Sequence, residues 1–148
     1  MKKFLIISLV AFLALAVGAR AQDGLQIDSL FSGAFVPAAK VTESIVSGKE
    51  LKPYNLDYFH SMRFQATDQE IARVATWIET DALTAVSKEM DSEEGKLTYA
   101  LLDFPADKAR HRYVGFQVKE AAGQRFVTVV YLTGKATQSN LKVIFKHR

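Results

Sequence analysis

The sequence predicts an α+β fold, in which a C-terminal antiparallel meander of three strands and one or two N-terminal strands pack against one long amphipathic helix and a C-terminal helix. Three C-terminal stretches are rich in β-branched and aromatic residues, as strands are: Leu97 to Phe104, Tyr113 to Lys119 and Arg125 to Thr133. Short links join them, and Ala121-Ala122-Gly123-Gln124 is typical of a hairpin loop with Gly123 at positive φ. Links this short favour antiparallel pairing.

The long helix is predicted from its first turn. Thr67 and Glu70 have the spacing of a capping box, in which a hydroxyl and a carboxylate satisfy the free backbone donors at a helix start. Apolar residues then recur on one face from Ile71 through Val86, although Thr80-Asp81 lies within the stripe. A last helix should begin after Thr137 and present an apolar face: Leu141, Ile144 and Phe145.

The N-terminal part is less regular. Residues 22–40 form an irregular segment with one short helical turn, which Asp28 should cap. Val41 to Val46 alternates apolar and polar residues and predicts an edge strand, and Tyr58 to Gln65 predicts a second strand. No low-complexity linker divides the chain, so residues 22–148 are expected to form a single α+β domain.

The first and third strands of the meander are apolar on both faces, and the two predicted helices are expected to cover one face only. An uncovered apolar sheet face is uncommon in a monomer. The other face should therefore be covered by the N-terminal segment, by a ligand, or by a partner. Such a partner would be another envelope protein or a second copy in a homo-oligomer, bound through the meander face.

The first 21 residues have the three-part layout of a secretory signal peptide. A basic start, Met1-Lys2-Lys3, precedes the apolar run Phe4 to Val17 and the small residues around Ala19-Arg20-Ala21. The apolar run is shorter than the ~20 residues that a membrane span needs, so no transmembrane segment is expected after cleavage. The sequence thus predicts an exported protein of the periplasm or of the cell surface.

Composition excludes several classes of function. Cleavage removes Lys2, Lys3 and Arg20, which takes the formal net charge from +3 to zero, so no surplus of positive charge for nucleic acid is expected. The chain has no cysteine, which excludes disulfides, thiol catalysis and cysteine-bound metals. No metal or cofactor is predicted, because the histidines lack ligand spacing and the glycines occur singly.

No catalytic residue is identified, because no glycine-flanked nucleophile elbow is present and the Ser139 to Lys142 spacing occurs without its companion motifs. An enzymatic alternative stays open, since carboxylates that are distant in sequence meet only in the fold. It is a small envelope hydrolase or lyase that acts on a glycan or peptide through carboxylates or through His60 and His111.

Two segments supply candidate binding residues. The connection between the N-terminal strands mixes charges, a proline and a tyrosine, and contributes Lys49, Lys52 and Tyr54. A basic cluster before the second meander strand contributes Arg110, His111 and Arg112, which suit an anionic glycan or phosphate. The alternative is structural: solvated loop charges, with Tyr54 and Leu56 packing at the edge of the core.

The chain also resembles a family of small exported Bacteroidota proteins of unknown function, which combine a signal peptide with one compact α+β domain. The resemblance lies in Ala21-Gln22, Gly24-Leu25 and Asp28-Ser29-Leu30-Phe31, in Gly48-Lys49-Glu50-Leu51 and Pro53-Tyr54-Asn55-Leu56, and in Tyr131-Leu132, Gly134, Ala136-Thr137 and Leu141-Lys142. It implies an envelope location and no site residue. The leading hypothesis is an exported non-enzymatic envelope domain that binds a protein or a ligand of unknown specificity.

The signal peptide can be tested by mass spectrometry of the native protein. Cleavage after Ala21 should give a mature chain that begins at Gln22. An intact Met1 on a cytosolic species would contradict the predicted location and the zero net charge together.

Overall fold

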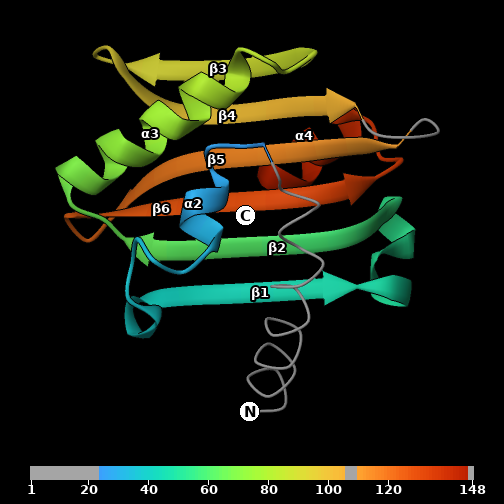
Figure 1. Ribbon diagram of the computed structural model, residues 1–148, viewed down its shortest axis with the longest axis horizontal. Helices are drawn as coiled ribbons and strands as arrows, with labels where there is room; N and C mark the ends of the chain where they lie inside the picture. The colour runs from blue at the N-terminus through green and yellow to red at the C-terminus, as the bar shows by residue number, and fades with distance from the viewer. Residues whose placement is uncertain (1–23, 106–109, 147–148) are drawn as a thin grey trace.

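A computed structural model describes residues 24–105 and 110–146, with the last four of these as backbone only. Its body is a six-stranded antiparallel sheet in the order β1-β2-β6-β5-β4-β3 (Figure 1). The strands are β1 (Val41–Ser47), β2 (Leu56–Gln65), β3 (Ser87–Glu93), β4 (Lys96–Pro105), β5 (His111–Ala121) and β6 (Gln124–Gly134). The helices are α2 (Asp28–Phe31), η1 (Ala38–Lys40), η2 (Gly48–Tyr54), α3 (Asp68–Ala82) and α4 (Gln138–Lys146), of which η1 and η2 are 3₁₀-helices.

The predicted fold class is therefore wrong. We expected an α+β fold with a three-stranded C-terminal meander, one or two further strands and one long helix. Instead, six strands dominate the molecule and the helices are small. The N-terminal hairpin and the C-terminal strands are one continuous sheet, because β2 pairs with β6 from Leu56 to Gln65.

The error arose between the helix and the meander. Ser87–Glu93 is a charged sequence in which we predicted no strand, but it is edge strand β3, and none of its residues is fully buried. Met90 is the only large apolar residue in this stretch, so it lacks the apolar alternation by which strands are recognised. Helix α3 correspondingly ends at Ala82 and not at Val86, and the link exposes Leu83 and Val86.

Several local predictions are confirmed. Thr67 and Glu70 form the capping box of α3, with Glu70 N donating to the Thr67 hydroxyl and Thr67 N to the Glu70 carboxylate. β1 is an edge strand, and Gly123 has a positive φ of 78° in the β5–β6 hairpin. Thr137 caps α4, because its hydroxyl accepts from Asn140 N at 3.3 Å. Asp28, in contrast, is the first residue of α2 and not its cap.

The sheet has a separate hydrophobic core on each face. In Figure 1, α2 and α3 lie in front of the sheet and α4 lies behind it. The front core joins α3 residues such as Val74 and Ile78 to Met62, Val114 and Val129 of the sheet. The core behind gathers smaller numbers of residues around α4: Leu51, Leu56, Leu101, Tyr113, Val130, Leu132, Ala136 and Leu141. The expectation that both helices cover one face is wrong, because they divide between the two.

The N-terminal segment from residue 24 is part of the front core. Leu25, Ile27 and Leu30 are buried in it. Asp81 near the end of α3 holds the segment, because its carboxylate accepts from Gln26 N at 2.7 Å and from Ile27 N at 3.0 Å. Burial of this carboxyl raises its pKa, although the two backbone donors act in the opposite direction.

A close backbone contact ties β2 to β6 and to the start of α4. Asn55 is left-handed with φ 58°, and its carbonyl accepts from Lys135 N and Ala136 N, each at 2.9 Å. Gly134 lies against it with φ 152°, and a Cβ there would be 2.5 Å from the Asn55 oxygen. Only glycine fits this position, for steric and for conformational reasons.

The predicted signal peptide, residues 1–21, lies outside the described residues. The predicted apolar side chains Ile144 and Phe145 also fall outside the described side chains. Within the described part of the chain, no helix has the length and apolar character needed to span a membrane.

Gly134→Ala should destabilise the fold by about 3 kcal/mol, because the added methyl group meets the Asn55 backbone and the residue must hold a positive φ. Urea unfolding followed by circular dichroism measures the change. Gly123→Ala is the matched control. Gly123 has a positive φ of 78°, but an added Cβ would have no atom within 4 Å, so this variant should lose about 1 kcal/mol of stability. Equal losses in the two variants would contradict the steric argument.

Candidate ligand-binding site

The structure brings both predicted groups of binding residues to the same end of the sheet. Lys49, Lys52 and Tyr54 belong to η2, which connects β1 to β2. Arg110 precedes β5, and His111 begins it. The two regions are neighbours because Leu56 pairs with Gly134, which also pairs with His111.

The side chains of the second group, Arg110, His111 and Arg112, do not all lie on the same face of the sheet. Successive side chains of a strand point to opposite faces of a sheet. Arg112 accordingly lies on the front face, with its guanidinium 5.8 Å from the centre of the Phe104 ring. His111 lies on the face of α4, stacked at 5.3 Å on Tyr113.

On the front face, side chains from several strands meet at a tyrosine–arginine cluster, which we define as Tyr58, Arg112 and Tyr131. Thr133 of β6 pairs with both Tyr58 of β2 and Arg112 of β5 and so brings the outer two close to Tyr131. The Tyr58 and Tyr131 ring centres are 6.0 Å apart. Tyr131 is fully buried, whereas Tyr58 and Arg112 are partly exposed.

The hydroxyl groups of the cluster are desolvated. Burial raises the pKa of Tyr131 to about 12, although Arg112, by its charge and a hydrogen bond, opposes the increase. Burial also raises the pKa of Tyr58, and the Glu43 carboxylate adds to this effect. The Tyr58 hydroxyl is buried and has no hydrogen-bond partner among the residues that the structure describes, which is unusual for a phenol.

A histidine–glutamate pair borders the cluster. His60 Nε2 is 2.5 Å from Glu43 Oε2, and the histidine side chain is 7% exposed against 29% for the glutamate. Phe31 of α2 packs on the His60 ring at 4.6 Å, and Tyr58 meets it edge-on at 6.4 Å. The histidine predicted as a candidate for catalysis thus lies in a mainly aromatic environment.

A second arginine, Arg110, lies at the solvent-exposed edge of the cluster. Arg110 Nη2 is 2.8 Å from Asp57 Oδ2 and 3.4 Å from the Thr133 hydroxyl, which itself donates to Asp57. The side chains of Arg110 and Asp57 are 43% and 50% exposed, so this pair stabilises little but remains accessible. Arg110 also lowers the pKa of Tyr131, which places its charge near the cluster.

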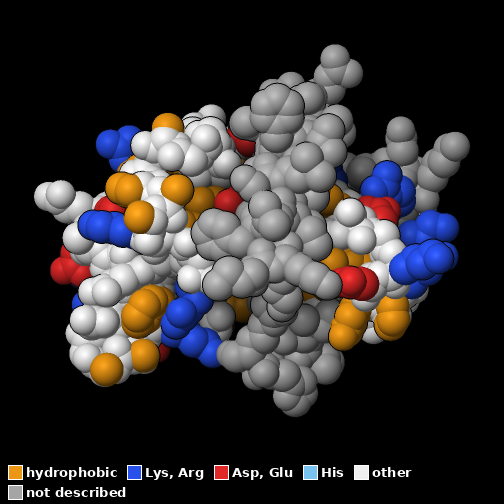
Figure 2. Space-filling model, turned by 90° about the horizontal axis from the view of Figure 1, so that it is seen from below, with side chains coloured by type: hydrophobic (Ala, Val, Ile, Leu, Met, Phe, Trp, Pro, Cys, Tyr) orange, Lys and Arg blue, Asp and Glu red, His pale blue; other side chains and the backbone are white. Residues whose placement is uncertain are grey.

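The remaining candidates are separate from this cluster. On the face of α4, His111 Nδ1 is 2.9 Å from Asp103 Oδ1. Lys49, Lys52 and Tyr54 are exposed on η2, at the end of the molecule where Figure 2 shows Lys and Arg side chains gathered. Tyr54 is 52% exposed and does not pack at the core edge, whereas Leu56 is buried there. Whether any of the six binds a ligand stays a prediction.

Among the described residues, no group of three or more His, Asp or Glu side chains is arranged to hold a metal ion. The site is a set of hydrogen-bond donors, two guanidinium groups and aromatic rings. Such a set can orient an anion.

Sequence analysis did not identify Tyr58, Tyr131, Glu43, Asp57 or Thr133 as site residues. Their juxtaposition depends on the pairing of β2 with β6, two strands far apart in the chain. One signal was available, because a tyrosine at a buried strand position usually needs a partner for its hydroxyl.

The fold and the cluster define a small antiparallel-sheet domain with helical covers on both faces and a polar cluster at one end of the sheet. The chain belongs to a family of unknown function, DUF6108, whose model matches residues 14–145. No curated protein matches the chain significantly.

The stability of the protein should fall as the pH rises from 10 to about 12. The pKa values of Tyr113 and Tyr131 are raised from 10.0 to about 12, so the folded protein holds these protons more tightly than the unfolded chain. Their contribution is complete below pH 10 and is lost as the pH passes the folded value. Urea unfolding across this range should show a shallower fall for Tyr131→Phe than for the wild type. The exposed Tyr54→Phe is the control, and a matching change there would contradict the assignment.

Proposed function

We propose that this protein is an exported, non-enzymatic domain of the cell envelope that binds a small carboxylate at the tyrosine–arginine cluster. Export is supported by the N-terminal pattern of a signal peptide. The observation that carries the binding proposal is the buried Tyr58 hydroxyl, which has no partner within residues 24–105 and 110–146, beside the Arg112 and Tyr131 pair.

An anion suits this site because of its charges. Arg112 and Arg110 both act electrostatically on the buried Tyr131 hydroxyl. A guanidinium presents parallel donors that match the two oxygens of a carboxylate, and a phenol adds a further donor. The Tyr58 hydroxyl can donate without breaking a hydrogen bond to any described residue.

The surroundings favour an anion that carries a ring or another apolar group. The Phe104 ring lies beneath Arg112, and the rings of Tyr58 and Tyr131 are 6.0 Å apart on its other side. Aromatic walls around a few polar groups are typical of small-molecule sites. An aromatic carboxylate satisfies the donors and the walls together.

Binding is favoured over the enzymatic alternative. Both candidate histidines form a pair with a carboxylate, His60 with Glu43 and His111 with Asp103. Among the described residues, neither histidine hydrogen-bonds to a hydroxyl group that would act as a nucleophile, and the pairs lie on opposite faces of the sheet. A carboxylate that satisfies a histidine is also an ordinary structural arrangement.

The proposal predicts saturable binding of benzoate, measured by NMR titration of the purified protein. Arg112→Gln should weaken binding by about tenfold or more, because it removes a charge-assisted pair of hydrogen bonds. Tyr58→Phe should weaken it several-fold without lowering the melting temperature, since the hydroxyl has no partner to lose.

Arg63→Gln is the matched control. Arg63 also lies over a phenylalanine, 4.3 Å from the centre of the Phe126 ring, but on the opposite face of the sheet. Benzoate affinity should be unchanged in this variant. The absence of saturable benzoate binding, or an equal loss in Arg63→Gln and Arg112→Gln, would refute the site. Equal affinity for benzamide, which lacks the charge, would refute the claim that the site selects an anion.

A further inference from the structure

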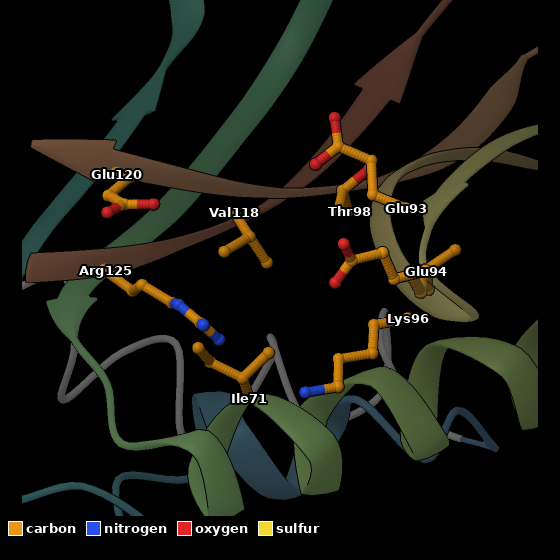
Figure 3. A pocket seen from close by; sticks show the side chains of 9 residues that line it. Ile71, Glu93, Glu94, Lys96, Thr98, Val118, Glu120 and Arg125 are labelled. Carbon is orange, nitrogen blue, oxygen red and sulfur yellow. The ribbon is translucent and has the colours of Figure 1, made fainter.

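The end of the sheet opposite the tyrosine–arginine cluster contains a groove, which we call the hairpin groove. It lies between the β3–β4 hairpin, the β5–β6 hairpin and the first turns of α3, and its volume is about 620 Å³ (Figure 3). Its lining consists of Ile71, Glu93, Glu94, Lys96, Leu97, Thr98, Val118, Glu120 and Arg125.

The floor of the hairpin groove is apolar and its walls are charged. Ile71 points up from α3 and Val118 points down from β5 toward the same space, as Figure 3 shows. Ile71 and Leu97 are buried, and Val118 is partly exposed. Charged side chains from both hairpins surround this floor. The groove can therefore hold an apolar side chain between charged ones.

The groove continues along α3. A second hollow of about 280 Å³ shares Ile71, Lys96, Leu97 and Arg125 with the first. It adds small residues of the helix, Ala72 and Ala75, and two more carboxylates: Asp68 and Glu79. The two hollows share lining residues and together extend from the hairpins along α3, which suits an extended chain segment.

Negative charge predominates in the two hollows together. Five carboxylates line them, namely Asp68, Glu79, Glu93, Glu94 and Glu120, against the two cations Lys96 and Arg125. Arg125 is already paired with Asp68 at 2.8 Å. The protein as a whole has no such negative excess, because its formal net charge is +3. The excess is thus local to the groove.

We propose that the hairpin groove binds an extended segment of a partner protein in which basic residues alternate with apolar ones. Side chains of an extended segment alternate in direction, so an apolar residue can face the floor while lysine or arginine residues reach Glu93, Glu94 and Glu120. The hairpin groove is distinct from the tyrosine–arginine cluster, and this proposal does not depend on carboxylate binding there.

The probe is the peptide acetyl-Lys-Val-Lys-Val-Lys-amide, titrated into the full protein by calorimetry at two salt concentrations. Saturable binding that weakens at the higher salt is expected. Replacement of the wall carboxylates by Glu93→Gln, Glu94→Asn and Glu120→Gln together should weaken it by about tenfold. Asn is used at position 94 because it tolerates the left-handed φ of 52° found there.

Two control variants distinguish binding in the hairpin groove from general attraction by negative charge. Glu50→Gln removes an exposed carboxylate on η2, at the other end of the molecule, and should leave peptide affinity unchanged. Val118→Thr keeps the shape of the floor but makes it polar, so it should weaken the peptide and leave spermine unaffected.

The proposal is wrong if the peptide does not bind, or if Glu50→Gln weakens it as much as the single variant Glu94→Asn. Spermine that binds as tightly as the peptide, with no effect of Val118→Thr, would show general attraction of polycations and would also overturn it. Melting temperatures confirm that each variant is folded. Benzoate binding in the same variants should be unchanged, which separates a failure here from a failure at the tyrosine–arginine cluster.

Discussion

The central strands of this protein are apolar on both faces, and the rest of the structure depends on that constraint. Leu101 and Leu102 of β4 are both fully buried although they point to opposite sides, and Val129 and Val130 of β6 are buried in the same way. Each face therefore needs its own cover. Helices α2 and α3 provide one and α4 the other, which produces two separate cores. Binding of a partner through the meander stays a prediction.

The covers also explain where polar groups are placed. The front core is packed around α3, and ionisable side chains such as Arg112 and His60 lie at the end of the sheet where β2 and β5 begin. The backbone contact of Asn55 with Gly134 holds the adjacent strands at that end. The hairpin groove forms at the other end, where residues of two hairpins and of the first turns of α3 line a common space. The two surfaces thus lie at opposite ends of one sheet and differ in charge.

Features that depend on neighbouring residues were predictable. The capping box at Thr67, the turn at Gly123 and the edge strand at Val41 follow from side-chain chemistry within a few residues. Strand β3 was missed because its charged sequence has no apolar alternation. Of the candidate site, the sequence indicated Arg110, Arg112 and His60 but none of their partners, since Tyr58, Tyr131 and Glu43 are brought to them by strand pairing.

The sequence by itself determined the kinds of local structure and the two-sided apolar character of the central strands, because both follow from residue type and spacing along the chain. Only the tertiary structure decided that β2 pairs with β6, that α3 and α4 take opposite faces, and that Arg112 and His111 are separated by the sheet. Those outcomes depend on contacts between residues far apart in the chain, and a periodic pattern carries no information about which distant segment will pair with it.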